Sequence, residues 1–98
     1  MADCSSYEEG MHAAEIGFDL IGTTMNGYTA YTKGTELPNI ELMRQLARDC
    51  GKPVNAEGGI WLSDQLKAAL DAGVHAAVIG GAITRPMEIT KRFVAAIQ

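Results

Sequence analysis

Short apolar runs alternate along the chain with segments in which apolar residues recur every three or four positions. The runs are typical of buried strands, and the spacing is typical of amphipathic helices. A parallel pair of strands needs a crossover, and a helix is the usual crossover. The pattern therefore predicts a parallel α/β sheet. The expected elements are a strand stub at 1–3, strands at 18–24, 53–57 and 76–80, and helices at 7–16, 38–50, 64–72 and from 86 onward.

Small polar residues and glycines set the expected ends of these helices. Ser5 or Ser6 can cap the first helix, and Gly17 can end it. Ser63 can cap the third helix, with Gly73 just past its end. The first and third predicted helices therefore each have a local start and stop signal.

The last helix shows the same amphipathic spacing. Ile89, Phe93 and Ile97 fall on one face, and Lys91 and Arg92 are expected to lie in solvent. The apolar face should pack on the rest of the domain.

A weak internal repeat supports a barrel. The segment Ala13–Gly17 before Leu20–Gly22 is echoed by Ala69–Gly73 before Val78–Gly80, at an offset of 56 residues. Two βα units of a barrel give such an offset, whereas solenoid repeats are usually shorter.

Charge and cysteine content narrow the function classes. The chain has 98 residues, a net charge of −4 and no run of basic residues, so neither nucleic acid nor an anionic membrane is an expected partner. Its apolar stretches are too short to span a membrane and its first residues are unlike a signal peptide, so a cytoplasmic location is expected. Cys4 and Cys50 are expected to be reduced structural thiols.

The candidate catalytic and phosphate-binding residues lie where two predicted strands end. Glu57 closes one strand and stands directly before Gly58 and Gly59, and the next strand ends in Gly80 and Gly81. The carboxyl ends of parallel strands meet at one edge of a sheet, where barrels build their active sites. A carboxylate beside a glycine-lined strand end predicts an acid/base group next to a phosphate cradle.

Five segments of the sequence give a more specific indication of function. The segments 1–5, 17–24, 27–29, 56–58 and 80–86 together resemble the N-acylmannosamine-6-phosphate 2-epimerase family. The likeness covers the whole chain but only the C-terminal part of that family's (βα)8 barrel, since such barrels run to about 250 residues. Residues 1–98 are therefore expected to be a single domain, a half-barrel that begins at the end of the fifth strand.

The resemblance implies an enzyme that interconverts N-acetylmannosamine 6-phosphate and N-acetylglucosamine 6-phosphate, with no redox cofactor and no required metal. Epimerisation next to a carbonyl needs a base, stabilisation of the enolate oxygen and an acid. By resemblance, Glu57 is one acid/base group and Asp3 holds sugar hydroxyls or orients a neighbour. The expected phosphate ligands are Arg85 and the backbone of Gly58, Gly80 and Gly81.

The family's second catalytic group looks to be a lysine on an earlier strand, in a region that this chain lacks. The lysines of this chain do not lie at strand ends, so none is a good substitute; they are Lys33, Lys52, Lys67 and Lys91. The isolated chain is therefore expected to be inactive. A half-barrel also exposes two edge strands, which predicts a homo-oligomer.

Each assignment has a simpler alternative. Glu57 and Arg85 could be solvated surface charges. Asp3 could be no more than the cap of the first helix, and Gly80 and Gly81 could serve packing or a tight turn. The whole chain could be a non-catalytic half-barrel that binds phosphate or acts as an oligomerisation module. The missing lysine discriminates between this non-catalytic function and the isomerase function.

Five further positions carry expectations. Asn55 replaces a usual aliphatic residue on the face of Glu57, where a buried amide needs partners, and Gly59 replaces a common arginine of the family. Tyr28 and Tyr31 lie in a loop that either covers substrate or fills space beneath it, and Trp61 is expected to serve packing.

Overall fold

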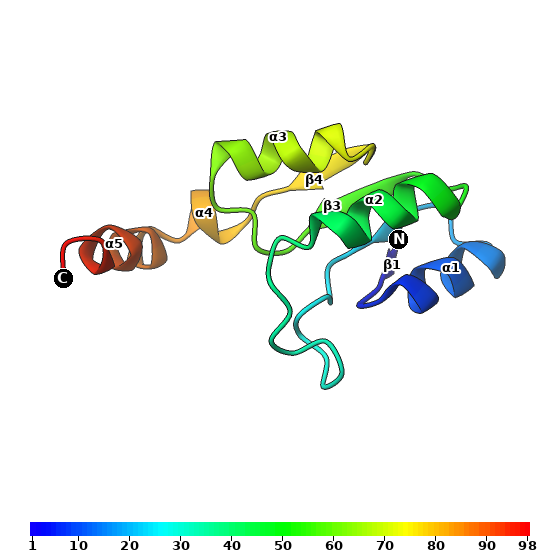
Figure 1. The fold of residues 1–98 in the computed structure, drawn as a ribbon, viewed down its shortest axis with the longest axis horizontal. Helices are drawn as coiled ribbons and strands as arrows, with labels where there is room; N and C mark the ends of the chain where they lie inside the picture. Colours follow the sequence, from blue (N-terminus) through cyan, green and yellow to red (C-terminus); the bar gives the residue numbers. More distant parts are fainter.

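A computed structural model describes residues 1–98, and its centre is one four-stranded parallel sheet. The strands lie in the order in which they occur in the sequence (Figure 1). They are β1 (Ala2–Asp3), β2 (Ile21–Gly22), β3 (Val54–Glu57) and β4 (Ala76–Val78). The predicted parallel α/β fold is confirmed, although β2 and β4 are shorter than the runs 18–24 and 76–80.

Three crossover helices lie against this sheet, and two more follow it (Figure 1). The crossovers are α1 (Tyr7–Glu15), α2 (Ile40–Asp49) and α3 (Ser63–Asp71). After β4 come the short α4 (Gly81–Thr84), which was not predicted as a separate helix, and α5 (Pro86–Ala95). No helix is both long and apolar enough to span a bilayer.

The core lies between the sheet and the crossover helices. Successive residues of a strand point to opposite faces, so Val54 and Ala56 face the helices while Asn55 and Glu57 face the other side. The helix side is closely packed: Gly10 in α1 stands so near α2 that a Cβ there would lie 2.5 Å from Leu46 Cδ2. A glycine is unfavourable inside a helix, and close helix contact explains this one.

The start of α1 confirms one of the two expected caps. The Ser6 hydroxyl accepts a hydrogen bond from the Glu9 amide at 3.2 Å, so Ser6 is the cap. The Glu9 carboxylate in turn accepts from the amide and hydroxyl of Ser5, at 2.7 and 2.6 Å. These bonds from Ser5, joined by one from Tyr31, lower the pKa of Glu9. Asp3 takes no part, so its alternative role as the helix cap is wrong.

The start of α3 differs from the expectation. Ser63 is the first residue of the helix rather than its cap, and Leu62 holds the cap position. The side-chain oxygen of Gln65 accepts hydrogen bonds from the amides of Trp61 and Leu62, at 2.8 and 2.9 Å. A side chain from inside the helix thus satisfies two amides at and before the cap position, which have no partner within the helix.

The last helix also differs from the expectation. Helix α5 projects from one end of the molecule, along its longest dimension of 47 Å (Figure 1). Phe93 is 74% exposed and Ile97, beyond the helix end, is 86% exposed, so the predicted apolar face is not buried. Arg92 is exposed, as expected, and its guanidinium also stacks 3.5 Å from the ring centre of Trp61.

Both cysteines are free, as expected. Cys4 is buried in the core, and burial raises the pKa of its thiol.

A hydrogen-bonded cluster joins α1 to the end of α2. The Tyr7 hydroxyl donates to Asp49 at 2.8 Å, and the Arg48 guanidinium donates to the same carboxylate at 2.7 and 2.9 Å. These bonds, that from Arg48 first, lower the pKa of Asp49 from 3.8 to about 2. The bond to Asp49 also raises the pKa of Tyr7, because it holds the proton on the phenol.

Leu46 of α2 is fully buried in the core and packs against Gly10 of α1. We expect Leu46→Ala to lower the free energy of unfolding by about 2–5 kcal/mol, because it removes buried methyl groups and leaves a cavity. Urea unfolding followed by circular dichroism measures the loss. The exposed Arg44→Ala on the same helix should change stability by less than about 0.5 kcal/mol. Equal losses in both variants would contradict this packing.

Acid stability should depend on Asp49. A carboxyl whose pKa is lowered in the fold stabilises it above the ordinary value of 3.8, and this contribution is lost as the pH falls toward about 2. We expect Asp49→Asn to lose less stability than the unaltered chain between pH of about 5 and about 2. Urea midpoints across that range measure the difference. Asp64→Asn, at an exposed position of α3, should keep the original pH dependence.

Candidate functional site

A cleft opens at the carboxyl-terminal edge of the sheet, beside β3 and β4. The register pairs Glu57 with Val78, so Glu57 and the glycines that follow β4 reach the same edge. The cleft has a volume of about 540 Å³. Its lining comes from β3, β4, α4, α5 and the loops around them: Thr24, Tyr28, Glu57, Gly58, Gly59, Ile60, Trp61, Val78, Gly80, Gly81, Ala82, Arg85 and Glu88.

Glu57 is held in place through its backbone. The Thr23 hydroxyl accepts a hydrogen bond from the Glu57 amide at 3.0 Å and donates one to the Glu57 carbonyl at 2.9 Å. Thr23 is itself buried at the end of β2. One side chain from the neighbouring strand therefore fixes both polar backbone groups of Glu57.

The Glu57 side chain remains available for a ligand. It is half-buried, lines the cleft and takes part in no hydrogen bond or ion pair within the chain. A carboxylate that is positioned by its backbone and free at its oxygens can accept a proton from a molecule in the cleft.

The predicted glycines surround the same space. Gly58 has a φ of +109°, a conformation that side-chain-bearing residues rarely adopt, and Gly80 and Gly81 line the same cleft. The fold's own backbone hydrogen bonds do not use the amides of Gly58, Gly80 and Gly81. Gly81 also packs against Trp61, whose ring would stand 3.3 Å from a Cβ there.

Charged side chains of opposite sign enter the cleft from the segment after β4. Arg85 lines the cleft, is exposed and forms no ion pair within the chain. Glu88, one turn further on, lines the cleft as well and lies 3.6 Å from Lys91. Arg85 is the one cation in the lining, which suits an anionic ligand group.

Asp3 lies at the same edge of the sheet but does not line this cleft. Asp3 is paired in register with Gly22 on β2. Its carboxylate accepts a hydrogen bond from the Thr24 hydroxyl at 2.9 Å. Thr24 does line the cleft. The structure therefore brings Asp3 next to a cleft residue, but two strands away from Glu57.

The two loop tyrosines have different surroundings. Tyr28 lines the cleft, whereas the Tyr31 hydroxyl lies 3.0 Å from the Ser5 hydroxyl and donates to Glu9 at the start of α1. Asn26 also ties the loop down, because its amide donates to the Ser5 carbonyl at 2.7 Å. One end of the loop is thus anchored on α1 while Tyr28 faces the cleft.

Asn55 and Gly59, the two positions expected to depart from the family, have clear local settings. Asn55 is buried, and its side-chain amide points to Met1 Sδ at 3.5 Å. Gly59 has a φ of +76°, and a Cβ there would lie only 2.4 Å from Leu37 Cβ. A side chain at position 59 is therefore excluded unless the loop around Leu37 moves.

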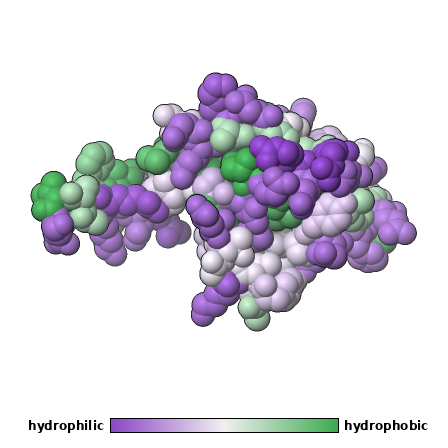
Figure 2. All heavy atoms as spheres, viewed as in Figure 1, coloured by the Kyte–Doolittle hydropathy of each residue, from purple (hydrophilic) through white to green (hydrophobic).

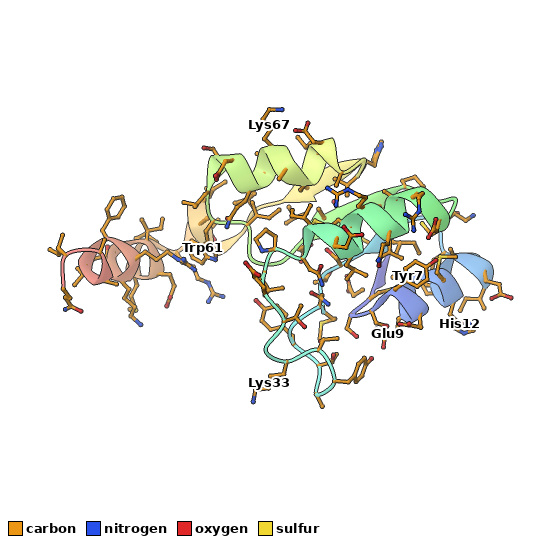
Figure 3. All side chains as sticks on the ribbon, viewed as in Figure 1. Tyr7, Glu9, His12, Lys33, Trp61 and Lys67 are labelled. Atoms are coloured by element: carbon orange, nitrogen blue, oxygen red, sulfur yellow. The ribbon has the colours of Figure 1, made fainter.

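No lysine approaches Glu57. Lys33 lies at the tip of the loop and Lys67 on the outer side of α3, both away from Trp61 at the cleft (Figure 3). Lys52 and Lys91 are absent from the cleft lining. The chain also has no group of three or more His, Cys, Asp or Glu side chains placed to hold a metal ion.

Three contributors to the site were missed by the sequence analysis. Thr23 acts through strand pairing, which a single sequence does not reveal, and Glu88 acts through the direction in which α5 leaves the sheet. Trp61 packs as expected, but it also lines the cleft. The position of Trp61, two residues after Gly59, was the sequence feature that could have indicated its place at the cleft.

Comparison with known proteins gives a consistent result. A family model described as "Putative N-acetylmannosamine-6-phosphate epimerase" matches residues 1–98. A protein from Caldanaerobacter subterraneus subsp. tengcongensis named "Putative N-acetylmannosamine-6-phosphate 2-epimerase" is 52% identical over 98 residues, which is 100% of this chain and 41% of that protein. A protein of the same name from Clostridioides difficile is 48% identical over 100% of this chain and 44% of its own length.

A solved structure is similar over nearly the whole chain. It is described as the N-acetylmannosamine-6-phosphate 2-epimerase from Clostridium perfringens, with a TM-score of 0.94 and 48% identity. The match covers 98% of this chain and 42% of that one. The chain thus spans less than half the length of the relatives it matches, and its sheet is part of a (βα) barrel. These matches confirm the resemblance drawn from the sequence.

The two hydrogen bonds of Thr23 should be important for the shape of the site. We expect Thr23→Val, which keeps the side-chain volume, to lower the free energy of unfolding by about 1–3 kcal/mol, because the amide and carbonyl of Glu57 lose their partner. Urea unfolding measures this loss. Thr90→Val, at an exposed position of α5, should change stability by less than about 0.5 kcal/mol. An unchanged Thr23→Val variant would show that the bonds do not matter.

Proposed function

We propose, because this chain belongs to the N-acetylmannosamine-6-phosphate epimerase family, that it supplies the carboxyl-terminal part of a site that epimerises N-acetylmannosamine 6-phosphate to N-acetylglucosamine 6-phosphate. The observation that carries the proposal is the cleft in which Glu57, Arg85 and three glycines meet. It offers a free carboxylate and a free cation to the same ligand. The substrate class is a phosphorylated amino sugar.

Glu57 is the proposed acid/base residue. Inversion at C2 of the open-chain sugar breaks the C2–H bond, leaves the electron pair in an enolate with the neighbouring carbonyl, and returns a proton to the opposite face. The Glu57 carboxylate transfers the proton on one face. Its fixed backbone favours this role, since a base must stay within hydrogen-bond reach of the proton it removes.

Arg85 and the glycines are the proposed phosphate ligands. A guanidinium can donate two parallel hydrogen bonds to a phosphate, and backbone amides can donate further ones. The amides of Gly58, Gly80 and Gly81 are not consumed by the fold, and these glycines line the cleft with Arg85. Asp3 is proposed to act on the sugar through Thr24, whose hydroxyl it holds at 2.9 Å.

The second proton-transfer group is the missing part of this site. The family's lysine falls outside this chain, and no lysine lines the cleft. Binding without turnover is therefore the second candidate function of the isolated chain, favoured by this absence together with the free Arg85. The assignment of residues 1–98 as one domain and a cytoplasmic location stay predictions from the sequence.

A chimera tests the proposal directly. Residues 1–98 replace the matched 42% of the Clostridium perfringens relative, so that the rest of the barrel is present. We expect this chimera to epimerise N-acetylmannosamine 6-phosphate, and the isolated chain to show no measurable turnover. In the chimera, Glu57→Gln should lower kcat by about 10²–10⁴-fold, because it removes one proton-transfer group. Arg85→Gln should mainly raise KM.

The matched control is Lys67→Gln, which also removes one charge but on the outer side of α3. It should leave both kinetic constants of the chimera unchanged. Turnover by the isolated chain that disappears in Glu57→Gln would refute the incomplete site. A folded chimera in which Glu57→Gln keeps full activity would refute the role of Glu57.

A further inference from the structure

A long loop without helix or strand connects β2 to α2 and spans residues 23–39 (Figure 1). Loops longer than about 12–15 residues are uncommon in compact domains and are usually functional when they are ordered. Thr23 and Thr24, at the start of the loop, already belong to the site. Figure 2 shows most of the loop as pale surface, because its Thr, Tyr and Gly residues have intermediate hydropathy. Such a surface suits contact with a polar ligand better than an apolar interface.

Tyr28 is the aromatic residue that this loop brings to the cleft. It lines the cleft together with Glu57 and Arg85, and it also lines a smaller hollow of about 360 Å³ beside Leu37 and Trp61. Its side chain is 64% exposed, and its hydroxyl has no hydrogen-bond partner in the chain. A side chain that only filled space beneath the loop would be buried. Tyr28 is therefore placed to contact a molecule in the cleft.

A buried hydroxyl fixes the backbone around Tyr28. The Thr32 hydroxyl oxygen accepts hydrogen bonds from the amides of Gly27 and Thr29, at 3.0 and 3.3 Å. These two residues stand directly before and after Tyr28. The Tyr28 amide donates to the Met25 carbonyl at 2.9 Å, and the Thr32 side chain is buried. The position of Tyr28 is therefore set by Thr32, from outside the cleft lining.

The same turn is tied to the start of α1 on both sides of Tyr28. Before it, the buried Asn26 donates to the Ser5 carbonyl at 2.7 Å. After it, the Tyr31 hydroxyl donates to the carboxylate of Glu9 in the first turn of α1 (Figure 3). Hydrogen bonds from Ser5 and Tyr31 lower the pKa of Glu9, so its carboxylate stays ionised and remains a strong acceptor at neutral pH. The turn is thus held in place before any ligand binds.

We propose that Tyr28 is a further substrate-binding residue, and that Thr32 and Tyr31 position it. The inference rests on the proposed function, in which the substrate is a phosphorylated amino sugar. Arg85 and the glycines take the phosphate, and Tyr28 contacts the carbon chain of the sugar. A tyrosine suits this contact because it combines an apolar ring with a polar hydroxyl. The hydrogen bonds of Thr32 and Tyr31 strengthen binding, since the ring is ordered in advance.

The kinetic constants of the chimera separate this role from that of Glu57. Tyr28→Ala should raise KM for N-acetylmannosamine 6-phosphate by about 3- to 30-fold and change kcat by less than about threefold. The reason is that Thr23 holds Glu57 from β2 without the help of Tyr28. Thr32→Val, which removes the acceptor, should also raise KM. Thr32→Ser keeps a hydroxyl and should restore it.

Double variants show whether Thr32 and Tyr31 act through Tyr28. Tyr31→Phe removes the bond to Glu9 and should raise KM, but neither it nor Thr32→Val should raise KM further in a Tyr28→Ala background. The matched control is Tyr7→Phe. It also removes a bond between a tyrosine and a carboxylate, that to Asp49 at 2.8 Å, but away from the loop, and it should leave KM unchanged.

A binding measurement on the chain itself needs no turnover. Trp61 is the single tryptophan of the chain and lines the cleft, so its fluorescence reports a bound ligand. Tyr28→Ala should weaken binding of N-acetylmannosamine 6-phosphate by about 3- to 30-fold and leave binding of inorganic phosphate unchanged. Arg85→Gln should weaken binding of both ligands. An inactive chimera would refute the proposed function, whereas this titration still tests Tyr28.

The role of Tyr28 would be overturned by a Tyr28→Ala variant with unchanged KM and unchanged affinity for the sugar phosphate, or by an unaltered chain that does not bind the sugar phosphate. Equal effects of Thr32→Val with and without Tyr28, or no recovery in Thr32→Ser, would overturn the positioning role. Circular dichroism verifies that each variant is folded. Tyr31→Phe, at an exposed side chain, gives the same test where Thr32→Val does not fold.

Discussion

The hydrogen bonds between the ends of β2 and β3 are the constraint on which the site depends. The amide of Thr23 donates to the Asn55 carbonyl at 3.2 Å, and its hydroxyl bonds to both backbone groups of Glu57. These three hydrogen bonds fix the position of Glu57 at the end of β3 relative to β2. They also fix where the chain turns after β3, and hence the position of Gly58 and of the loop that ends at Trp61. The cleft is therefore a product of strand pairing.

The sequence was sufficient for the features that depend on local order along the chain. Alternating apolar runs predicted the parallel sheet, and a carboxylate followed by glycines at a strand end predicted that Glu57, Gly58, Gly80 and Gly81 would line one space. Parallel topology brings the carboxyl ends of the strands to one edge of the sheet, regardless of the conformation of the loops. This is why the prediction survived although two strand lengths were wrong.

The sequence was insufficient where a side chain has competing partners. Ser63 has the right chemistry for a cap, but Leu62 holds the cap position, and Gln65 accepts hydrogen bonds from the amides of Trp61 and Leu62. The apolar spacing of α5 predicted a buried face, but periodicity does not tell which surface covers a helix or whether the same chain provides it. The strand order places Asp3 two strands away from Glu57, which a single sequence does not reveal, and its role in holding sugar hydroxyls or orienting a neighbour stays a prediction. Such outcomes depend on tertiary contacts.

The crowding at Gly59 links two distant segments of the chain. A Cβ at position 59 would collide with Leu37, so a side chain at 59 and the present placement of residue 37 exclude each other. A member of the family that carries an arginine after the Glu-Gly pair must therefore have a differently shaped loop before α2. Substitutions at these two positions should be inherited together, and a transplant of either segment alone between relatives should produce a mismatched pair.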